Sequence, residues 1–282
     1  DVGIVGDRII AIGNLDESAR EEIDARGRIV APGFVDIHTH YDGQATWDQE
    51  MAPSAWHGVT TVVMGNCGVG FAPAAPERQD WLIGLMEGVE DIPGSALAEG
   101  MTWDWESFPD YLNALEKLDR TIDVAAQVPH GAVRAYVMGD RGAANEAPTD
   151  DDIAHMAGIV EEGLLAGAVG FSTSRTILHK SVEGELVPGT TATKEELLGI
   201  GDALKRAGHG VFELASDLHP DWDEFGWMGD LSRDTGAAVA FTALESPIKG
   251  LSFAQQLAEM RVQNQAGAQI IAQISMRGTG LI

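Results

Sequence analysis

The chain has 282 residues, of which 44% are hydrophobic and 22% are charged, a composition typical of globular proteins and not of disordered ones. Its 18 basic and 44 acidic residues give a formal net charge of −26, and a surface of that sign repels nucleic acid and anionic lipid. The sequence has no run of about eighteen apolar residues, so no membrane partner is expected.

The N-terminal residues predict a small β element. Residues 2–12 alternate apolar and polar side chains around Gly6 and Asp7, which indicates a β-hairpin. A further short strand is expected at residues 22–23. The element formed by residues 1–30 is too small to bury a face of its own.

After Pro32 and Gly33 the pattern changes to short apolar runs that alternate with helical periodicity. Continuous apolar runs of this kind are typical of parallel strands that are buried on both faces. The predicted strands span residues 34–37, 60–64, 122–128, 169–172, 211–214, 238–242 and 269–274.

Several of the intervening helices have recognisable ends. Thr149 and the acidic residues after it form a capping-box start, with an apolar face on the helix that follows. Thr193 begins another helix, and Gly208 ends it. Apolar residues spaced three and four apart between 108 and 118 predict a third helix.

Strand and helix alternate about seven times, which predicts an α/β fold: an incomplete (β/α)8 barrel of the TIM type over residues 31–282, without its last unit. A doubly wound open sheet is the alternative, but no glycine-rich phosphate fingerprint follows a strand. The segment of residues 73–120, between the second and third predicted strands, is too long for a simple crossover. We expect it to form a helical insertion over the active face of the barrel. Both chain ends interrupt regular strand patterns, so we expect a fragment of a longer protein.

His38 and His40 follow the first barrel strand, in the stretch VAPGFVDIHTHYDGQ. Residues two apart in a strand point the same way. Enzymes with a TIM-type barrel place their active sites at the carboxyl ends of the barrel strands. Two neutral imidazoles on one face can bind a divalent ion at about 2.0–2.1 Å each. Two histidines separated by one residue also occur often by chance. The prediction of a metal site therefore depends on their position directly after a buried strand.

Cys67 lies directly after the second strand, in VVMGNCGVGFAP, and is the one cysteine of the chain. Without a partner for an internal disulfide it fits a reducing compartment, and we expect a cytoplasmic protein. Its placement at a strand end predicts a thiolate zinc ligand near the two histidines. The alternative is a small buried thiol in a tight turn flanked by glycines.

Five segments in the same order resemble the amidohydrolase superfamily, and within it the D-aminoacylase, or N-acyl-D-amino-acid deacylase, branch. They are PGFVDIHTHYDGQ, HGVTTVVMGNCGVGFAP, MTWDWESFPDYLNAL, VPHGAVRAYVMG and AGAVGFSTSR. The resemblance implies a metal-dependent barrel flanked by a small β-sandwich that is built from both chain ends. It also implies that His38, His40 and Cys67 bind one or two Zn²⁺ ions, and that a small-molecule amide, most typically an N-acyl amino acid, is hydrolysed at a non-peptide C–N bond.

Three further residues are predicted to bind substrate. His130, in VPHGAVR, matches a family position near the substrate. Arg175 and His179 follow the fourth strand, where a guanidinium could hold a substrate carboxylate through two hydrogen bonds. A solvent salt bridge for Arg175 and a loop position for His179 are the alternatives.

The sequence also departs from the family pattern. The family carries a histidine after the fifth strand and another after the sixth, whereas these places read VFELASD and VAFTALESP. Glu213 is the nearest possible ligand there, provided that its side chain does not face the helices. The catalytic aspartate, the general base of the family, is expected beyond residue 282. A cyclic amidase of the dihydroorotase or hydantoinase kind, and a non-catalytic barrel with a degenerate metal site, therefore remain as alternative functions.

Overall fold

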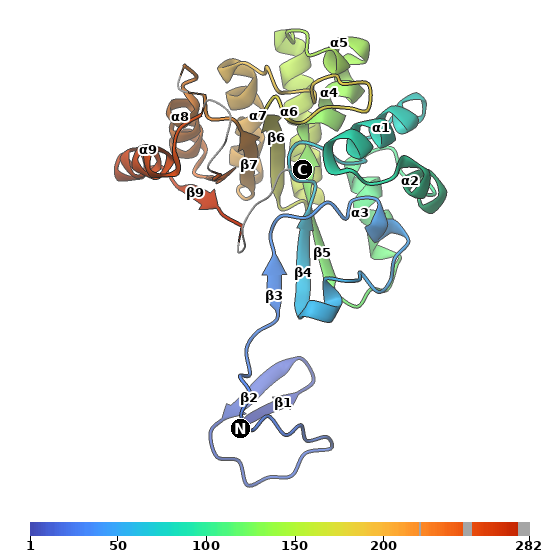
Figure 1. The fold of residues 1–282 in the computed structure, drawn as a ribbon, viewed down its shortest axis with the longest axis vertical. Coiled ribbons are helices and arrows are strands. Elements are labelled where there is room, and N and C mark those ends of the chain that lie inside the picture. The colour runs from blue at the N-terminus through green and yellow to red at the C-terminus, as the bar shows by residue number, and fades with distance from the viewer. Residues whose placement is uncertain (220, 245–249, 276–282) are drawn as a thin grey trace. The chain divides into compact units, whose positions relative to one another are not determined.

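The computed structural model describes residues 1–219, 221–244 and 250–275. The chain forms two units, one of residues Asp1–Gly33 and a larger one that begins at Phe34. Figure 1 shows the elements of each unit in order along the chain.

The first unit contains the predicted hairpin. Strands β1 (Val2–Val5) and β2 (Arg8–Ile12) pair antiparallel, and Gly6 in the turn between them has a positive φ of 61°. Glycine adopts this conformation without the steric cost that a side chain would add. The short strand expected at residues 22–23 is wrong: both residues lie outside any strand, and the Ile23 side chain is exposed. Residues 22–23 are a short segment among charged neighbours, and no strand pairs with them.

The larger unit is built on a seven-stranded sheet in which every strand pairs in parallel with the next one along the chain. The strands are β3 (Phe34–Asp36), β4 (Val59–Met64), β5 (Asp123–Pro129), β6 (Gly170–Arg175), β7 (Val211–Ser216), β8 (Ala238–Thr242) and β9 (Ile270–Gln273). All seven strands predicted for this part of the chain are confirmed, with some ends shifted. The strand order β3 to β9 is that of a TIM-like α/β fold and not of a doubly wound sheet.

The helices follow the strands in chain order. Between β4 and β5 lie α1 (Gln79–Glu90), α2 (Gly94–Gly100) and α3 (Phe108–Glu116), and between β5 and β6 lie α4 (His130–Met138), α5 (Asp140–Ala143) and α6 (Asp150–Ala166). The later helices are α7 (Lys194–Ala207), α8 (Glu224–Thr235) and α9 (Phe253–Gln265). Short 3₁₀ helices span Gln44–Thr46, Ala55–His57 and Pro76–Arg78.

The helix ends agree with the sequence-based predictions. The Thr149 hydroxyl accepts a hydrogen bond from the Asp152 amide, and the Asp152 carboxylate returns to Thr149, so α6 begins in a capping box. Thr193 caps α7 in the same way through the Glu196 amide, and Gly208 ends it in the left-handed conformation. Such caps satisfy backbone groups that a helix end leaves unpaired.

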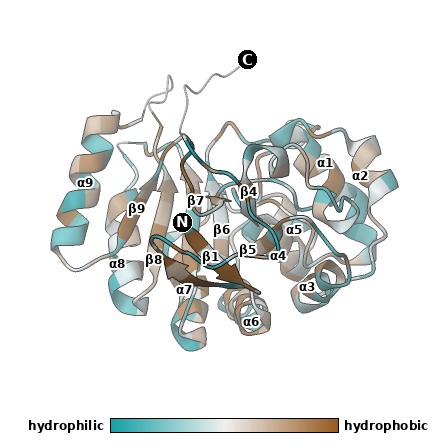
Figure 2. Ribbon diagram, turned by 90° about the horizontal axis from the view of Figure 1, so that it is seen from below, coloured by the Kyte–Doolittle hydropathy of each residue, from teal (hydrophilic) through white to brown (hydrophobic). Residues whose placement is uncertain are grey.

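The core lies between the sheet and a layer of helices on its outer side. Helices α6, α7, α8 and α9 pack one against the next, as Figure 1 shows. Strand residues such as Val62, Phe171, Phe212 and Val239 are fully buried. Figure 2 shows the helices banded in teal and brown, as expected for helices that present one face to a core. No helix within the described ranges is long and apolar enough to cross a membrane.

The sheet is curled into a half-barrel. The first and last strands approach closely enough for the His38 Nδ1 atom, just after β3, to lie 3.0 Å from the Gln273 Oε1 atom at the end of β9. Phe34 and Val35 on β3, and Ile271 on β9, are 66%, 57% and 53% exposed. The two edges of the half-barrel therefore carry large apolar side chains that the described residues do not cover.

Candidate metal centre

His38 and His40 project together because the residue between them is fixed to the neighbouring strand. Both the amide and the hydroxyl of Thr39 donate to the Val63 carbonyl oxygen on β4, at 3.0 and 2.7 Å. Thr39 is thereby turned into the protein, and the two imidazoles face the mouth of the half-barrel. Their ring centroids are 5.5 Å apart.

Cys67 reaches the same mouth through a tight turn after β4. Its φ of 55° is in the left-handed region, and Gly65 has a φ of 76°. A Cβ atom on Gly65 would lie 2.2 Å from the Gln127 carbonyl oxygen, so only glycine fits there. Asn66 closes the turn by donating to the Thr39 carbonyl at 3.1 Å. The thiol is buried, as the alternative interpretation required, but it also faces the histidines.

The three predicted ligands converge. His38, His40 and Cys67 each offer a ligand atom, and these atoms all lie within 4.8 Å of one another. The His38 Nε2 atom is 3.2 Å from the Cys67 Sγ atom. Two ligands of one tetrahedral zinc ion, with bonds of about 2.0–2.3 Å, stand roughly 3.5 Å apart, so this separation suits a shared cation.

A second group shares the same sulfur. Cys67, Glu90 and His179 also bring their ligand atoms within 4.8 Å of one another. Glu90 is the last residue of α1, and its Oε1 atom lies 3.2 Å from the His40 Nε2 atom. His179 was predicted as a substrate-binding residue, and its Nδ1 atom lies 3.0 Å from the Ser174 hydroxyl. Glu90 was not predicted, because nothing in its local sequence distinguishes it from the other acidic residues of the insertion.

The electrostatics of the cluster favour a cation. Burial lowers the pKa of His38, lowers that of His40 well below its ordinary value, and lowers that of His179 to about 4. Burial also raises the pKa of the Cys67 thiol and raises that of Glu90 to about 8. Neutral imidazoles are the form that binds metals, and a nearby divalent charge would stabilise the thiolate and the carboxylate.

Among the residues that the structure describes, two buried atoms near the cluster find no hydrogen-bond partner. The His40 Nδ1 atom and the Glu213 Oε1 atom are buried without a hydrogen-bond partner. A buried polar group without a partner is costly, which is the expected condition of groups that meet a ligand. The donor set of two imidazoles and a thiol suits zinc, and so the residues present fit a divalent ion.

Glu213 faces the mouth and not the helices. It is fully buried on β7, where its Oε2 atom accepts a hydrogen bond of 3.1 Å from the Cys67 amide. Its Oε1 atom is 3.9 Å from the His38 Nδ1 atom. Burial raises its pKa to about 8, and burial raises that of Asp42, a second buried carboxyl, to about 7. Glu213 thus supports the turn that presents the thiol.

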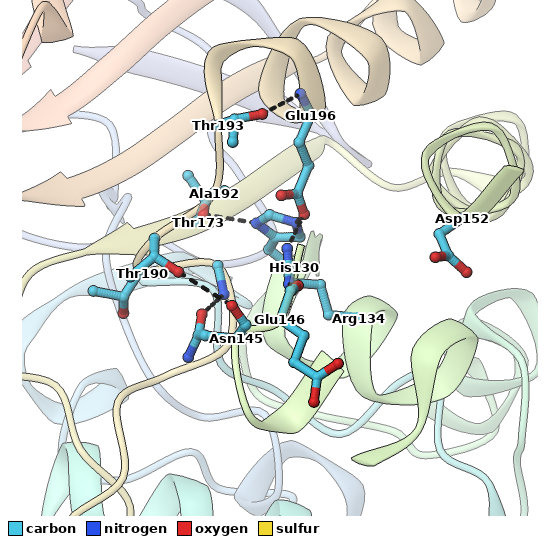
Figure 3. Close-up of polar contacts among 12 residues, drawn as sticks. His130, Arg134, Asn145, Glu146, Asp152, Thr173, Thr190, Ala192, Thr193 and Glu196 are labelled. Carbon is cyan, nitrogen blue, oxygen red and sulfur yellow. Dashed lines mark hydrogen bonds and ion pairs between the residues drawn. The ribbon is translucent and has the colours of Figure 1, made fainter. Parts of the chain in front are cut away.

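His130 lies in a buried polar network. Figure 3 shows its ring between Thr173 and Glu196, with Nδ1 at 2.9 Å from the threonine hydroxyl and Nε2 at 3.1 Å from the glutamate. The Glu196 carboxylate also pairs with Arg134, and all three charged or titratable side chains are almost fully buried. Both ring nitrogens are engaged inside the protein, so no atom of His130 is presented to a ligand in this structure. Its role in substrate binding stays a prediction.

Arg175, at the end of β6, is also held by internal contacts. Its Nε atom donates to Glu224 at 2.7 Å and its Nη1 atom donates to the Ala192 carbonyl at 2.6 Å. The guanidinium lies over the rings of Trp222 and Trp227. Arg175 thus pairs with the nearly buried carboxylate of Glu224 and not with a solvent-exposed group. Its binding of a substrate carboxylate stays a prediction.

Comparison with known proteins gives a consistent picture. Residues 21–269 match the model of the family described as Amidohydrolase family. The chain is 37% identical over 209 residues to a D-aminoacylase of Alcaligenes xylosoxydans xylosoxydans, a match that covers 74% of this chain and 38% of that protein. It is 37% identical over 213 residues to an N-acyl-D-glutamate deacylase of the same organism, again covering 74% and 38%.

Solved structures resemble the chain over nearly its whole length. A D-aminoacylase with a binuclear metal centre superposes with a TM-score of 0.77 at 29% identity, covering 97% of this chain and 53% of that one. An N-acyl-D-glutamate deacylase of Bordetella bronchiseptica, in complex with zinc and a phosphonate inhibitor, gives a TM-score of 0.67 at 27% identity, covering 95% and 52%. The chain therefore spans about half the length of these solved relatives, and 38% of the curated ones.

Proposed function

Because the chain belongs to the amidohydrolase family, we propose that His38, His40 and Cys67 bind a divalent metal ion, zinc, at which the complete protein hydrolyses a non-peptide C–N bond. The convergence of these three ligand atoms within 4.8 Å of one another is the observation that carries the proposal. A bound zinc ion supplies Lewis acidity, which activates water at neutral pH and polarises a carbonyl oxygen.

The protein's own contribution is to hold the ligands in place. Gln273 occupies the Nδ1 atom of His38, which leaves the Nε2 atom free to face the thiol. Glu213 holds the Cys67 amide, and Thr39 fixes the strand between the histidines. Hydrogen bonds of this kind orient metal ligands and tune their affinity.

We propose an N-acyl amino acid as the small-molecule substrate. The supporting observation is that the similar proteins include both a D-aminoacylase and an N-acyl-D-glutamate deacylase, which share an amide on a D-amino acid and differ in the side chain. Arg175 remains our proposal for the substrate carboxylate and His130 and His179 for residues near the substrate. For Arg175 this requires that the guanidinium exchange or share its contact with Glu224.

The finer architecture is also a proposal. We propose that residues 31–282 form most of a (β/α)8 barrel, with residues 73–120 as an insertion, and that an eighth strand carries the general-base aspartate. The exposed apolar side chains on β3 and β9 support a strand that fits between these edges. Residues 1–30 would then belong to a small β-sandwich, whose hairpin exposes Ile9 and Ile10 within the N-terminal unit.

The test uses the complete protein and two double variants. His38→Ala/His40→Ala should lose zinc and the hydrolysis of N-acetyl-D-amino acids, whereas the control His57→Ala/His155→Ala, at two exposed histidines, should keep both. Hydrolysis of dihydroorotate or hydantoin in place of N-acyl amino acids would favour a cyclic amidase. Bound zinc with no hydrolysis of either class would favour a non-catalytic barrel. Equal zinc content in wild type and in the His38→Ala/His40→Ala variant would contradict the proposed centre.

A further inference from the structure

We propose that Asn145 is a positioning residue for substrate binding, and that it acts on Arg175 through the segment of residues 186–193. The inference rests on the proposed function, since it takes Arg175 as the group that binds the carboxylate of an N-acyl amino acid. Asn145 lies two residues after the end of α5, on none of the elements that carry the proposed metal ligands.

The Asn145 side chain ties a distant part of the chain to the end of α5. Its Nδ2 atom donates to the Leu186 and Val187 carbonyl oxygens at 3.1 and 3.2 Å. Its Oδ1 atom accepts a hydrogen bond of 2.9 Å from the Gly189 amide. These partners lie 41 to 44 positions later in the chain. Figure 3 shows Asn145 beside the segment that carries Thr190.

The segment depends on such a side chain because it has few backbone partners of its own. Residues 187–190 are buried and belong to no helix or strand. Buried backbone groups need hydrogen-bond partners, and Asn145 supplies them to two carbonyls and one amide. Asn145 itself has a φ of 58°, a conformation that asparagine adopts more readily than most residues with a side chain. One asparagine therefore suits both the turn and the contact.

The same segment holds the guanidinium of Arg175. The Ala192 carbonyl accepts a hydrogen bond of 2.6 Å from the Arg175 Nη1 atom. The Ala192 amide donates to the Gly189 carbonyl at 3.0 Å, so Ala192 is tied to the residue that Asn145 binds. If the guanidinium exchanges its Glu224 contact for a substrate carboxylate, the bond to Ala192 is the one described hydrogen bond that still orients it.

The segment also lies against His130, the other buried residue that we propose near the substrate. Gly189 has a φ of 102°, and a Cβ atom on it would lie 2.5 Å from the His130 Nδ1 atom. The backbone at Gly189 therefore contacts the imidazole directly. A shift of residues 186–193 would disturb both His130 and Arg175, and Asn145 is placed to prevent it.

The test compares two substrates of the complete protein: the N-acetyl-D-amino acid that the wild type hydrolyses fastest, and its carboxamide, which lacks the carboxylate. Asn145→Gly removes the side chain and keeps the left-handed backbone without strain. We expect kcat/KM for the acid to fall about 10-fold, chiefly through KM, and kcat/KM for the carboxamide to fall less than about 3-fold. Bound zinc should stay at the wild-type level.

The matched control is Asn264→Ala. Asn264 also donates to a carbonyl and accepts from an amide, both of Ile270 at the amino end of β9, at 2.9 and 2.7 Å. Its loss should lower stability and leave the ratio of kcat/KM between acid and carboxamide unchanged. Asn145→Asp is a second variant in case Asn145→Gly does not fold. Its carboxylate accepts from the Gly189 amide but cannot donate to the two carbonyls, so the ratio should fall in the same direction.

A double-variant cycle tests the route through Arg175. In the Arg175→Gln background, Asn145→Gly should change kcat/KM for the acid less than about 3-fold, because the contact on which it acts is already lost. A further loss of about 10-fold in that background would overturn the route. Equal losses on acid and carboxamide in Asn145→Gly would mean that Asn145 only stabilises the fold, and would overturn the inference. A wild type that hydrolyses no N-acyl amino acid would contradict the proposed function itself, and this inference with it.

Discussion

The His38 Nε2 atom lies 3.2 Å from the Cys67 Sγ atom, although the two residues are separated by 29 positions and follow different strands of the sheet. This contact exists because β3 and β4 are parallel neighbours whose carboxyl ends meet at one edge. The turn at Gly65 then folds the thiol back towards the first strand. The proposed metal site is therefore a property of two adjacent strand ends.

Replacement of Gly65 by alanine should disrupt the turn that presents Cys67. The new Cβ atom would overlap the Gln127 carbonyl and would also require a positive φ. We expect the free energy of unfolding to fall by about 2–4 kcal/mol, together with weaker zinc binding. Denaturant unfolding and zinc titration measure the two effects.

The matched control is Gly158→Ala. Gly158 is an exposed residue of α6, and a Cβ atom there meets nothing within 4 Å. This change should raise the free energy of unfolding by about 0.5–1 kcal/mol, since alanine is the better helix former. If both glycine variants behaved alike, the steric account of the turn would be wrong.

Cys67→Ser should separate metal binding from folding. The hydroxyl is close in size to the thiol but is a much weaker zinc ligand, so zinc affinity should fall by roughly 10–100-fold or more. The stability of the metal-free protein should change by no more than about 1 kcal/mol. At a zinc concentration of 100 times the wild-type Kd, the wild type should gain about 2.7 kcal/mol and the variant much less. Thermal unfolding with and without zinc measures this, and equal gains would exclude Cys67 as a ligand.

Glu196→Gln should destabilise the interior at a distance from the metal cluster. Arg134 is almost fully buried and its pairing carboxylate is fully buried, so the substitution leaves an uncompensated charge. The expected loss is about 3–5 kcal/mol in the free energy of unfolding. The control is Lys194→Gln, which removes the partly exposed ion pair between Lys194 and Asp230. Its effect on the free energy of unfolding should stay within about 1 kcal/mol. Similar losses of unfolding free energy in the two variants would show that the buried pair between Arg134 and Glu196 contributes no more to stability than an exposed pair does.

The buried imidazole of His130 predicts a pH dependence of stability. Burial lowers its pKa below the ordinary 6.5, although the hydrogen bond to Glu196 acts in the opposite direction. The unfolded chain therefore takes up a proton on this imidazole near pH 6.5, whereas the folded protein takes it up only at a lower pH. The stabilising contribution of the neutral ring is complete above pH 6.5 and is lost as the pH falls below it.

This dependence is measured as a difference between wild type and His130→Gln, since glutamine does not titrate in this range. The stability advantage of the wild type should shrink as the pH is lowered from 7.5 to about 5, and it should be constant above about pH 7. An advantage that grew on acidification would mean that the folded protein holds His130 in its charged form.

Much of the fold could be predicted because the strands are short apolar runs and the helices have capping residues. The parallel strands from β3 to β9 and the cap at Thr149 follow from such local signals. The convergence of His38 and His40 with Cys67 could also be anticipated, since parallel strand ends meet.

The remaining site residues depend on contacts between distant segments. Glu90 reaches the cluster through the close packing of Gly88 on Lys180, and no local pattern encodes that contact. The inward direction of Glu213 depends on the register of β7, and the burial of His130 depends on Glu196, 66 residues later. Propensity and periodicity describe neighbours along the chain, and they carry no information on such pairs.

The most direct test of the central claim is X-ray absorption at the zinc edge on the purified complete protein. We expect a zinc ion with imidazole nitrogens at about 2.0–2.1 Å and a sulfur at about 2.3 Å, and the sulfur scattering should vanish in Cys67→Ser. Zinc surrounded by oxygen and nitrogen alone in the wild type, or no bound metal, would contradict it.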